Sequence, residues 1–148
     1  MVICLTSLSL ESFLFVRHTM LDHIGITVPC SRFEEVTAWY GAALAPLGYS
    51  KQKEFHGHGV GFGPDRLTIT FWISAKEGVG VAAAHIAFRC SDRETVEKFH
   101  EESIKAEGKD NGKPGWRHQH HPKYYAAFVL DPVGYVRCTL ILRHADAM

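Results

Sequence analysis

The chain has 148 residues, 46% of them apolar, and its 16 lysines and arginines balance its 16 aspartates and glutamates. This length and apolar content are enough for one domain with its own core, and they exclude a disordered chain. The balanced charge provides no net field that would attract a nucleic acid or an anionic membrane, so we expect neither as a partner.

The four cysteines lie far apart in the sequence and form no CxxC pair; they are Cys4, Cys30, Cys90 and Cys138. This spacing fits neither a zinc knuckle nor a dense disulfide framework. We therefore expect reduced thiols and a cytoplasmic protein.

An apolar stretch over residues 1–19 precedes the first well-patterned segment. No basic residue comes before the apolar run, Glu11 interrupts it, and it is shorter than the roughly 20 residues of a membrane span. The sequence therefore predicts neither a signal peptide nor an anchor. Two alternatives stay open: an extension outside the fold, or an extra strand or helix docked on it.

The first patterned unit is expected at about residues 20–78. Alternating apolar residues predict a strand over 21–28, and the S-x-x-E capping box at Ser31 predicts a helix that a glycine ends. Two strands are expected after the helix, over residues 59–63 and 67–74. The alternating glycines of residues 57–63 are typical of a flexible hairpin.

The second unit, at about residues 82–143, repeats this order, and residues 144–148 form a tail. A strand over 83–90 leads to a second capping box at Ser91. The later elements are a long loop from Lys109 to His121, where Asn-Gly and Lys-Pro dipeptides favour a turn, and two strands over 124–130 and 135–142 joined by the turn Asp131-Pro132-Val133-Gly134.

The repeat is the main architectural signal. The two capping boxes are 60 residues apart, and a His-Ile pair occurs in the strand before each of them, at His23 and His85. The isoleucines must face the helix, so each histidine lies on the opposite face of its sheet. We expect an α+β fold of two βαβββ units. Their sheets would form an incomplete barrel around a concave pocket that contains the histidines.

Five motifs accompany the repeat over residues 20–142: DHIGITV, AWYGAALAPLGY, HIAF, DNGKPGWR and HHPKYYAAFVLDPVG. As a set they resemble the vicinal oxygen chelate superfamily. This group includes glyoxalase I, extradiol dioxygenases, and the bleomycin and fosfomycin resistance proteins. The resemblance implies a glyoxalase-like fold and a small-molecule substrate or ligand.

The resemblance also implies a divalent metal ion (zinc, iron, nickel or manganese) that the substrate chelates through two adjacent oxygens. The implied ligands are His23, His85 and Cys138, with Thr70 or Thr68 at the matching place in the first unit. Members with an intact site usually have glutamate where this chain has Cys138. Two imidazoles and a thiolate suit zinc, whereas manganese and magnesium prefer oxygen donors. The alternative for Cys138 is a small buried apolar residue.

The resemblance places His121 and two tyrosines on the pocket rim, and His121 and Tyr125 are the candidate catalytic residues. The expected substrate-binding residues are Phe62, Trp72, His121, Tyr124 and Tyr125. Two simpler interpretations stay open. The segment around His121 can be a solvated polar loop, and the strand aromatics can be core residues.

Three functions follow, and the superfamily default favours the first. It is a metal-dependent lyase, isomerase or dioxygenase acting on a small molecule with vicinal oxygens. The second is a metal-free binding protein of the bleomycin resistance type, and the third is a metal-independent enzyme that uses His85 or His121 as acid or base. The missing carboxylate removes a general base, which weakens the case for glyoxalase-type isomerisation. A homodimer is compatible with the resemblance.

Overall fold

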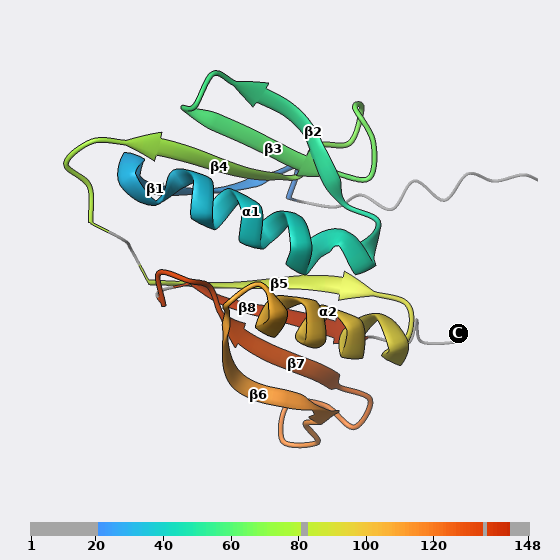
Figure 1. Cartoon of the computed structure of the whole chain (residues 1–148). Coiled ribbons are helices and arrows are strands. Elements are labelled where there is room, and N and C mark those ends of the chain that lie inside the picture. The colour runs from blue at the N-terminus through green and yellow to red at the C-terminus, as the bar shows by residue number, and fades with distance from the viewer. Residues whose placement is uncertain (1–20, 81–82, 135, 143–148) are drawn as a thin grey trace, which may run out of the picture.

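The structure, a computed structural model, describes residues 21–80, 83–134 and 136–142, the last of these as a backbone only (Figure 1). The segment 1–19, the tail at 144–148 and the predicted domain end at residue 143 lie outside the described residues. Within the described ranges, none of the helices is long and apolar enough to span a membrane.

The chain forms two βαβββ units, as the repeat predicts, in a mixed α+β fold without a closed barrel (Figure 1). The first unit comprises β1 (Ile24–Pro29), α1 (Phe33–Leu44), β2 (Ser50–Phe55), β3 (Gly59–Gly63) and β4 (Phe71–Lys76). The second comprises β5 (Ala84–Cys90), α2 (Arg93–Lys105), β6 (Lys109–Trp116), β7 (Tyr125–Leu130) and β8 (Val136–Leu142). The strand orders are β1-β4-β3-β2 and β5-β8-β7-β6, with only the first pair of each sheet parallel.

The sequence pattern does not locate β2 or β6, and the long loop predicted over Lys109–His121 is wrong over its first eight residues. Both strands lie at the edge of a sheet and are mostly exposed, so they lack the apolar alternation that marks a half-buried strand. The Asn-Gly dipeptide does not form the predicted turn. It lies in an irregular part of β6, where the register with β7 shifts on either side of Gly112.

The helix N-caps predicted from the capping boxes are also wrong: each helix begins one residue later than Ser31 and Ser91 imply. A short 3-10 turn over Cys30–Arg32 displaces the start of α1, so that Arg32 precedes the helix without a side-chain cap. In the second unit Asp92 is the N-cap, because its carboxylate accepts hydrogen bonds from the Thr95 backbone N–H and from the Thr95 hydroxyl, both at 2.7 Å. An ionised carboxylate is a stronger acceptor there than the Ser91 hydroxyl.

Removing the Asp92 cap is expected to make the stability of the second unit less dependent on pH. Hydrogen bonds from Thr95 hold the pKa of the Asp92 carboxyl below its usual range. The stabilisation is therefore complete above the unfolded pKa and is lost as the pH falls through the folded one. Asp92→Ala should lower the melting temperature at pH 7, and the difference from the wild type should shrink as the pH falls below the usual pKa range of an aspartate.

Asp92→Asn is the control for this cap, because the amide still accepts the Thr95 hydrogen bonds but does not titrate. Its melting temperature should stay close to that of the wild type at pH 7. Equal melting temperatures for Asp92→Ala and the wild type at pH 7 would contradict the cap.

The glycines of β3 have a packing role rather than the flexible role predicted from their alternation. All five residues of β3 are buried. A Cβ at Gly61 would lie 2.6 Å from the side chain of Ile69, and a Cβ at Gly63 would lie 1.8 Å from the carbonyl oxygen of Thr68. The chain that precedes β4 therefore crosses this face of β3 in direct contact with its backbone.

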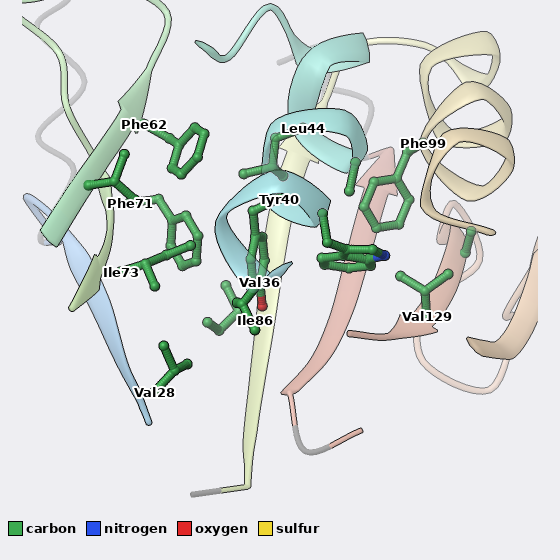
Figure 2. Close-up of a cluster of buried hydrophobic side chains, with 14 of the residues drawn as sticks. Val28, Val36, Tyr40, Leu44, Phe62, Phe71, Ile73, Ile86, Phe99 and Val129 are labelled. Atoms are coloured by element: carbon green, nitrogen blue, oxygen red, sulfur yellow. The ribbon is translucent and has the colours of Figure 1, made fainter. Parts of the chain in front are cut away.

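One core joins both units, and α1 contributes to it on more than one side. The ring of Tyr40 lies 4.7 Å from that of Phe71 in the first sheet, while Trp39 Nε1 donates a 3.0 Å hydrogen bond to the Ser103 carbonyl of α2. Figure 2 shows side chains of α1, the first sheet and the second unit in a single cluster. Across the middle of this core the rings of Phe71 and Phe88 meet edge to face at 5.5 Å.

We call the face of each sheet opposite to its helix the free face. Gly25 and Thr27 in the first sheet, and His85, Ala87 and Arg89 in the second, lie on these faces and are exposed. These free-face residues are thus exposed, and the core that the two units share lies on the helix-covered side of the sheets. Side chains of α1 contact both units there, through Tyr40 on Phe71 and Trp39 on Ser103.

Candidate functional site

His23 lies immediately before β1 and is 59% exposed in its side chain. Its Nδ1 atom is 2.7 Å from the carboxylate of Asp22, which is itself 95% exposed. The backbone N–H of Ile24 donates to the Thr70 carbonyl, so His23 lies beside Thr70 at the start of the first sheet. The Thr70 hydroxyl is within 2.9 Å of the Tyr49 hydroxyl, which places it in a hydrogen bond inside the unit.

His85 lies on β5, on the free face of the second sheet, as its alternation with Ile86 predicts. Its ring centroid is 6.5 Å from that of Phe128 on β7. Strand register places Phe128 in the same row as Thr139 and Ala87, so the two aromatic rings share this face. His85 therefore has an apolar neighbour on a surface that is otherwise open.

The backbone of Cys138 is in register with Ile86 on one side and Val129 on the other. His85 is in register with Arg137 instead. Residues paired across a sheet share a face, so the Cys138 position belongs to the helix-covered face. The backbone register thus does not place the Cys138 position in the same row as His85.

His23 and His85 belong to different sheets, and the side chain of Cys138 lies outside what the structure describes. Among the residues the structure describes, no three His, Cys, Asp or Glu side chains are grouped so that they could hold an ion. The position equivalent to Thr70 in the second unit is Arg137, because Thr70 lies beside His23 and Arg137 is in register with His85. The matching of Thr70 with Cys138 from the sequence is therefore shifted by one residue.

The two strand aromatics proposed as pocket walls have different environments. Phe62 is 2% exposed and packs on Phe71, 6.3 Å between ring centroids, so it is a core residue. Trp72 is on the free face of the first sheet beside Gly25, and its indole stacks on Phe55 at 6.1 Å. Only Trp72 is placed where a ligand could reach it.

The histidine and the tyrosines of the HHPKYY segment also lie in different environments. His121 is exposed and its Nδ1 accepts the Lys123 backbone N–H at 3.1 Å, within a turn that follows β6. Tyr124 is half-buried, with its ring 5.2 Å from that of His120. Tyr125 lies on the helix side, where its hydroxyl donates to Glu97 of α2 at 3.0 Å.

Tyr125 is 9% exposed, and burial raises the pKa of its phenol, with the Glu97 carboxylate adding to the effect. The guanidinium of Arg93 covers its ring at 5.3 Å. A phenol held in this way between a helix and a sheet supports the packing of α2.

An open hollow of about 230 Å³ lies where β6, β7 and their connection meet. Its lining comprises Asn111, Gly112, Arg117, Gln119, His120 and Phe128. Phe128 links this hollow to His85 on the same free face. The sequence did not single out the lining residues between 111 and 120, because that segment was predicted to be a loop. The available signal was an arginine that closely follows two glycines, Gly112 and Gly115.

No family model and no curated protein matches the chain. Solved structures do match it. A glyoxalase/bleomycin resistance protein from Albidiferax ferrireducens superposes with a TM-score of 0.69 and 22% identity, over 85% of this chain and 100% of that one. A putative glyoxalase from Bacillus halodurans gives 0.61 and 20%, over 85% and 97%. A glyoxalase/bleomycin resistance protein/dioxygenase family enzyme from Burkholderia phytofirmans gives 0.60 and 16%, over 82% and 96%.

Proposed function

With the glyoxalase-like fold of the vicinal oxygen chelate superfamily as the premise, we propose that this chain is a metal-free binding protein for a small molecule. The observation that carries the proposal is the hollow on the free face of the second sheet, beside His85. The fold is shared by enzymes and by resistance proteins, so the site and not the fold decides between them.

The hollow combines the two features that small-molecule sites share. Phe128 provides an apolar surface, and the amides of Asn111 and Gln119 and the imidazole of His120 provide polar groups around it. The hollow is open, so a ligand bound in it would be only partly enclosed. The donors that a metal would need are not grouped within the described residues.

Calorimetric titration of chelator-treated protein with catechol and with a hydrophobic vicinal dicarbonyl tests the proposal. We expect saturable binding of at least one of them without added metal. Phe128→Ala should weaken it by about tenfold, which corresponds to about 1.4 kcal/mol, because the apolar surface is removed. Trp72→Ala, on the free face of the other sheet, is the matched control and should leave the affinity unchanged.

Two results would contradict this proposal. One is the absence of saturable binding for both compounds. The other is a loss of affinity in Trp72→Ala but not in Phe128→Ala, which would place the ligand on the first sheet.

A metal-dependent lyase, isomerase or dioxygenase is the second candidate, and the observation that favours it is the equivalence of His23 and His85. Each histidine belongs to the free face of its own sheet, outside the common core. A second copy of the chain would have to bring two free faces together to complete such a site, so this candidate requires a homodimer.

Zinc titration followed by sedimentation distinguishes this second candidate. It requires tight saturable zinc uptake by the wild type, lost in both His23→Ala and His85→Ala, together with a dimer. Uptake that survives either substitution would count against it.

A further inference from the structure

The strongest unassigned chemistry in the molecule is the environment of Arg117, at the start of the connection from β6 to β7. Its guanidinium donates to the carbonyl oxygens of Lys113 at 2.6 Å and of Trp116 at 3.1 Å. It also lies 5.5 Å from the centroid of the Phe128 ring. These contacts fix the guanidinium over the floor of the hollow rather than leaving it extended in solvent.

Two glycines make room for this arrangement. A Cβ at Gly115 would lie 2.8 Å from Arg117 Nη1, and a Cβ at Gly112 would lie 3.5 Å from Arg117 Nη2 and 3.0 Å from the ring of Phe128. A side chain at Gly115 would displace the end of the guanidinium, whereas a Cβ at Gly112 would press on the Phe128 ring that the guanidinium faces. The sequence DNGKPGWR thus carries glycine beside the arginine and beside its aromatic partner.

The charge of Arg117 is not matched by a carboxylate. In the described parts of the chain, every ion pair at 4.0 Å or less involves other residues. The neighbouring Asp110 is engaged by the His100 ring and by the Gly112 backbone N–H, at 3.0 and 2.9 Å. The two carbonyl contacts use two of the five N–H groups of the guanidinium, so donors remain for a ligand.

A second basic residue lies close to the hollow. Lys113 on β6 is exposed, and its carbonyl oxygen accepts from the Arg117 guanidinium. A half-buried arginine beside an aromatic ring, with side-chain amides next to it, matches the recognition of a planar anion. The fork of the guanidinium binds the two oxygens of a carboxylate, and the ring contacts the carbon skeleton.

We propose that the hollow around Arg117 binds the carboxylate of a small organic acid whose flat apolar part packs on Phe128, with Asn111 and Gln119 as further hydrogen-bonding groups. The proposal specifies that the ligand is an anion. It rests on the proposed function, which places ligand binding on the free face of the second sheet. The volume of about 230 Å³ accommodates a one-ring acid. The site uses none of the candidate metal ligands.

Calorimetric titration with benzoate, its neutral isostere benzamide and inorganic phosphate tests the proposal on chelator-treated full-length protein. We expect benzoate to bind at least about tenfold more tightly than benzamide, since hydrogen bonds to a charged group are stronger than those to a neutral one. Phosphate, which lacks the apolar part, should bind more weakly than benzoate.

Three variants locate the effect. Arg117→Gln should weaken benzoate binding by at least about tenfold, and Arg117→Lys, which keeps the charge without the fork, should weaken it severalfold. Gly115→Ala should also weaken it, because the new methyl group displaces the flexible end of Arg117 while the fold is kept. Lys113→Gln is the matched control: it removes a nearby charge and should change affinity by less than about twofold.

Equal binding of benzoate and benzamide overturns the carboxylate proposal while leaving a neutral ligand, and with it the proposed function, in place. Equal losses in Arg117→Gln and Lys113→Gln overturn it too, because the attraction would then be a general one. If none of the compounds of either experiment binds, both proposals fail. Should Arg117→Gln not fold, as judged by circular dichroism, the ratio of benzoate to benzamide affinity in Gly115→Ala decides: a ratio as large as that of the wild type contradicts the site.

Discussion

Trp39→Ala is expected to lower the free energy of unfolding by about 3–5 kcal/mol, the range typical of a buried tryptophan. Trp39 is 1% exposed, and its indole N–H joins α1 of the first unit to the Ser103 carbonyl of α2 in the second. The indole also packs edge to face on Tyr40 at 4.7 Å. Removing it leaves a cavity where the two units meet, and it removes one of the two hydrogen bonds to the Ser103 carbonyl, which also accepts from the Gly108 N–H at 2.9 Å. Urea denaturation followed by circular dichroism measures the loss.

Trp116→Ala is the matched control, because the same atoms are removed from a residue that is 36% exposed at the sheet edge. Its ring contributes a contact with the guanidinium of Arg93 at 4.5 Å, worth about 0.5–1 kcal/mol at such a site. Trp39→Phe separates the contribution of packing from that of the hydrogen bond to Ser103, because phenylalanine keeps most of the apolar volume but has no N–H. Equal losses for Trp39→Ala and Trp116→Ala would show that the units are not held together here.

Gly63→Ala is expected to destabilise the protein by about 3 kcal/mol, at the upper end of the range for overpacking. The added Cβ would lie 1.8 Å from the Thr68 carbonyl oxygen, and this atom belongs to the backbone and cannot rotate away. The chain between β3 and β4 would have to move, which would disturb the 3.1 Å hydrogen bond from the Thr70 N–H to the Phe62 carbonyl. Thermal unfolding gives the measurement.

Gly80→Ala is the control for this prediction, because a Cβ there meets nothing within 4 Å. It should leave the melting temperature unchanged within about 1 °C, as expected for an exposed position away from special features. An equally mild result for Gly63→Ala would mean that the approach of Thr68 to β3 is not tight in solution.

The repeat was sufficient to predict the fold, because it rests on local signals that each unit contains twice. The strands with His23 and His85 have one apolar and one open face, and this alternation fixes which way each histidine points. The turn Asp131-Pro132-Val133-Gly134 is confirmed by a 2.8 Å hydrogen bond from the Gly134 N–H to the Asp131 carbonyl. Such features depend on neighbours in the sequence.

The features that could not be predicted depend on contacts between distant segments. The pattern of α1 shows that it is apolar, but not that it packs on both units through Trp39 and Tyr40. For the candidate site, the face that holds Cys138 depends on the register between β5 and β8, which one residue of slip reverses. The hollow around Arg117 depends on bulges of β6 that leave no mark in apolar periodicity.

The strands β2 and β6, which the sequence pattern did not reveal, each form one edge of a sheet. An open edge has unpaired backbone groups that can recruit further chains and start a fibril. In β2 this tendency is opposed by Lys51 and Lys53 and by a register shift between them. In β6 it is opposed by Pro114 and by irregular pairing around Gly112. These edges therefore resist aggregation at high protein concentration through the same irregularities that make them hard to recognise as strands.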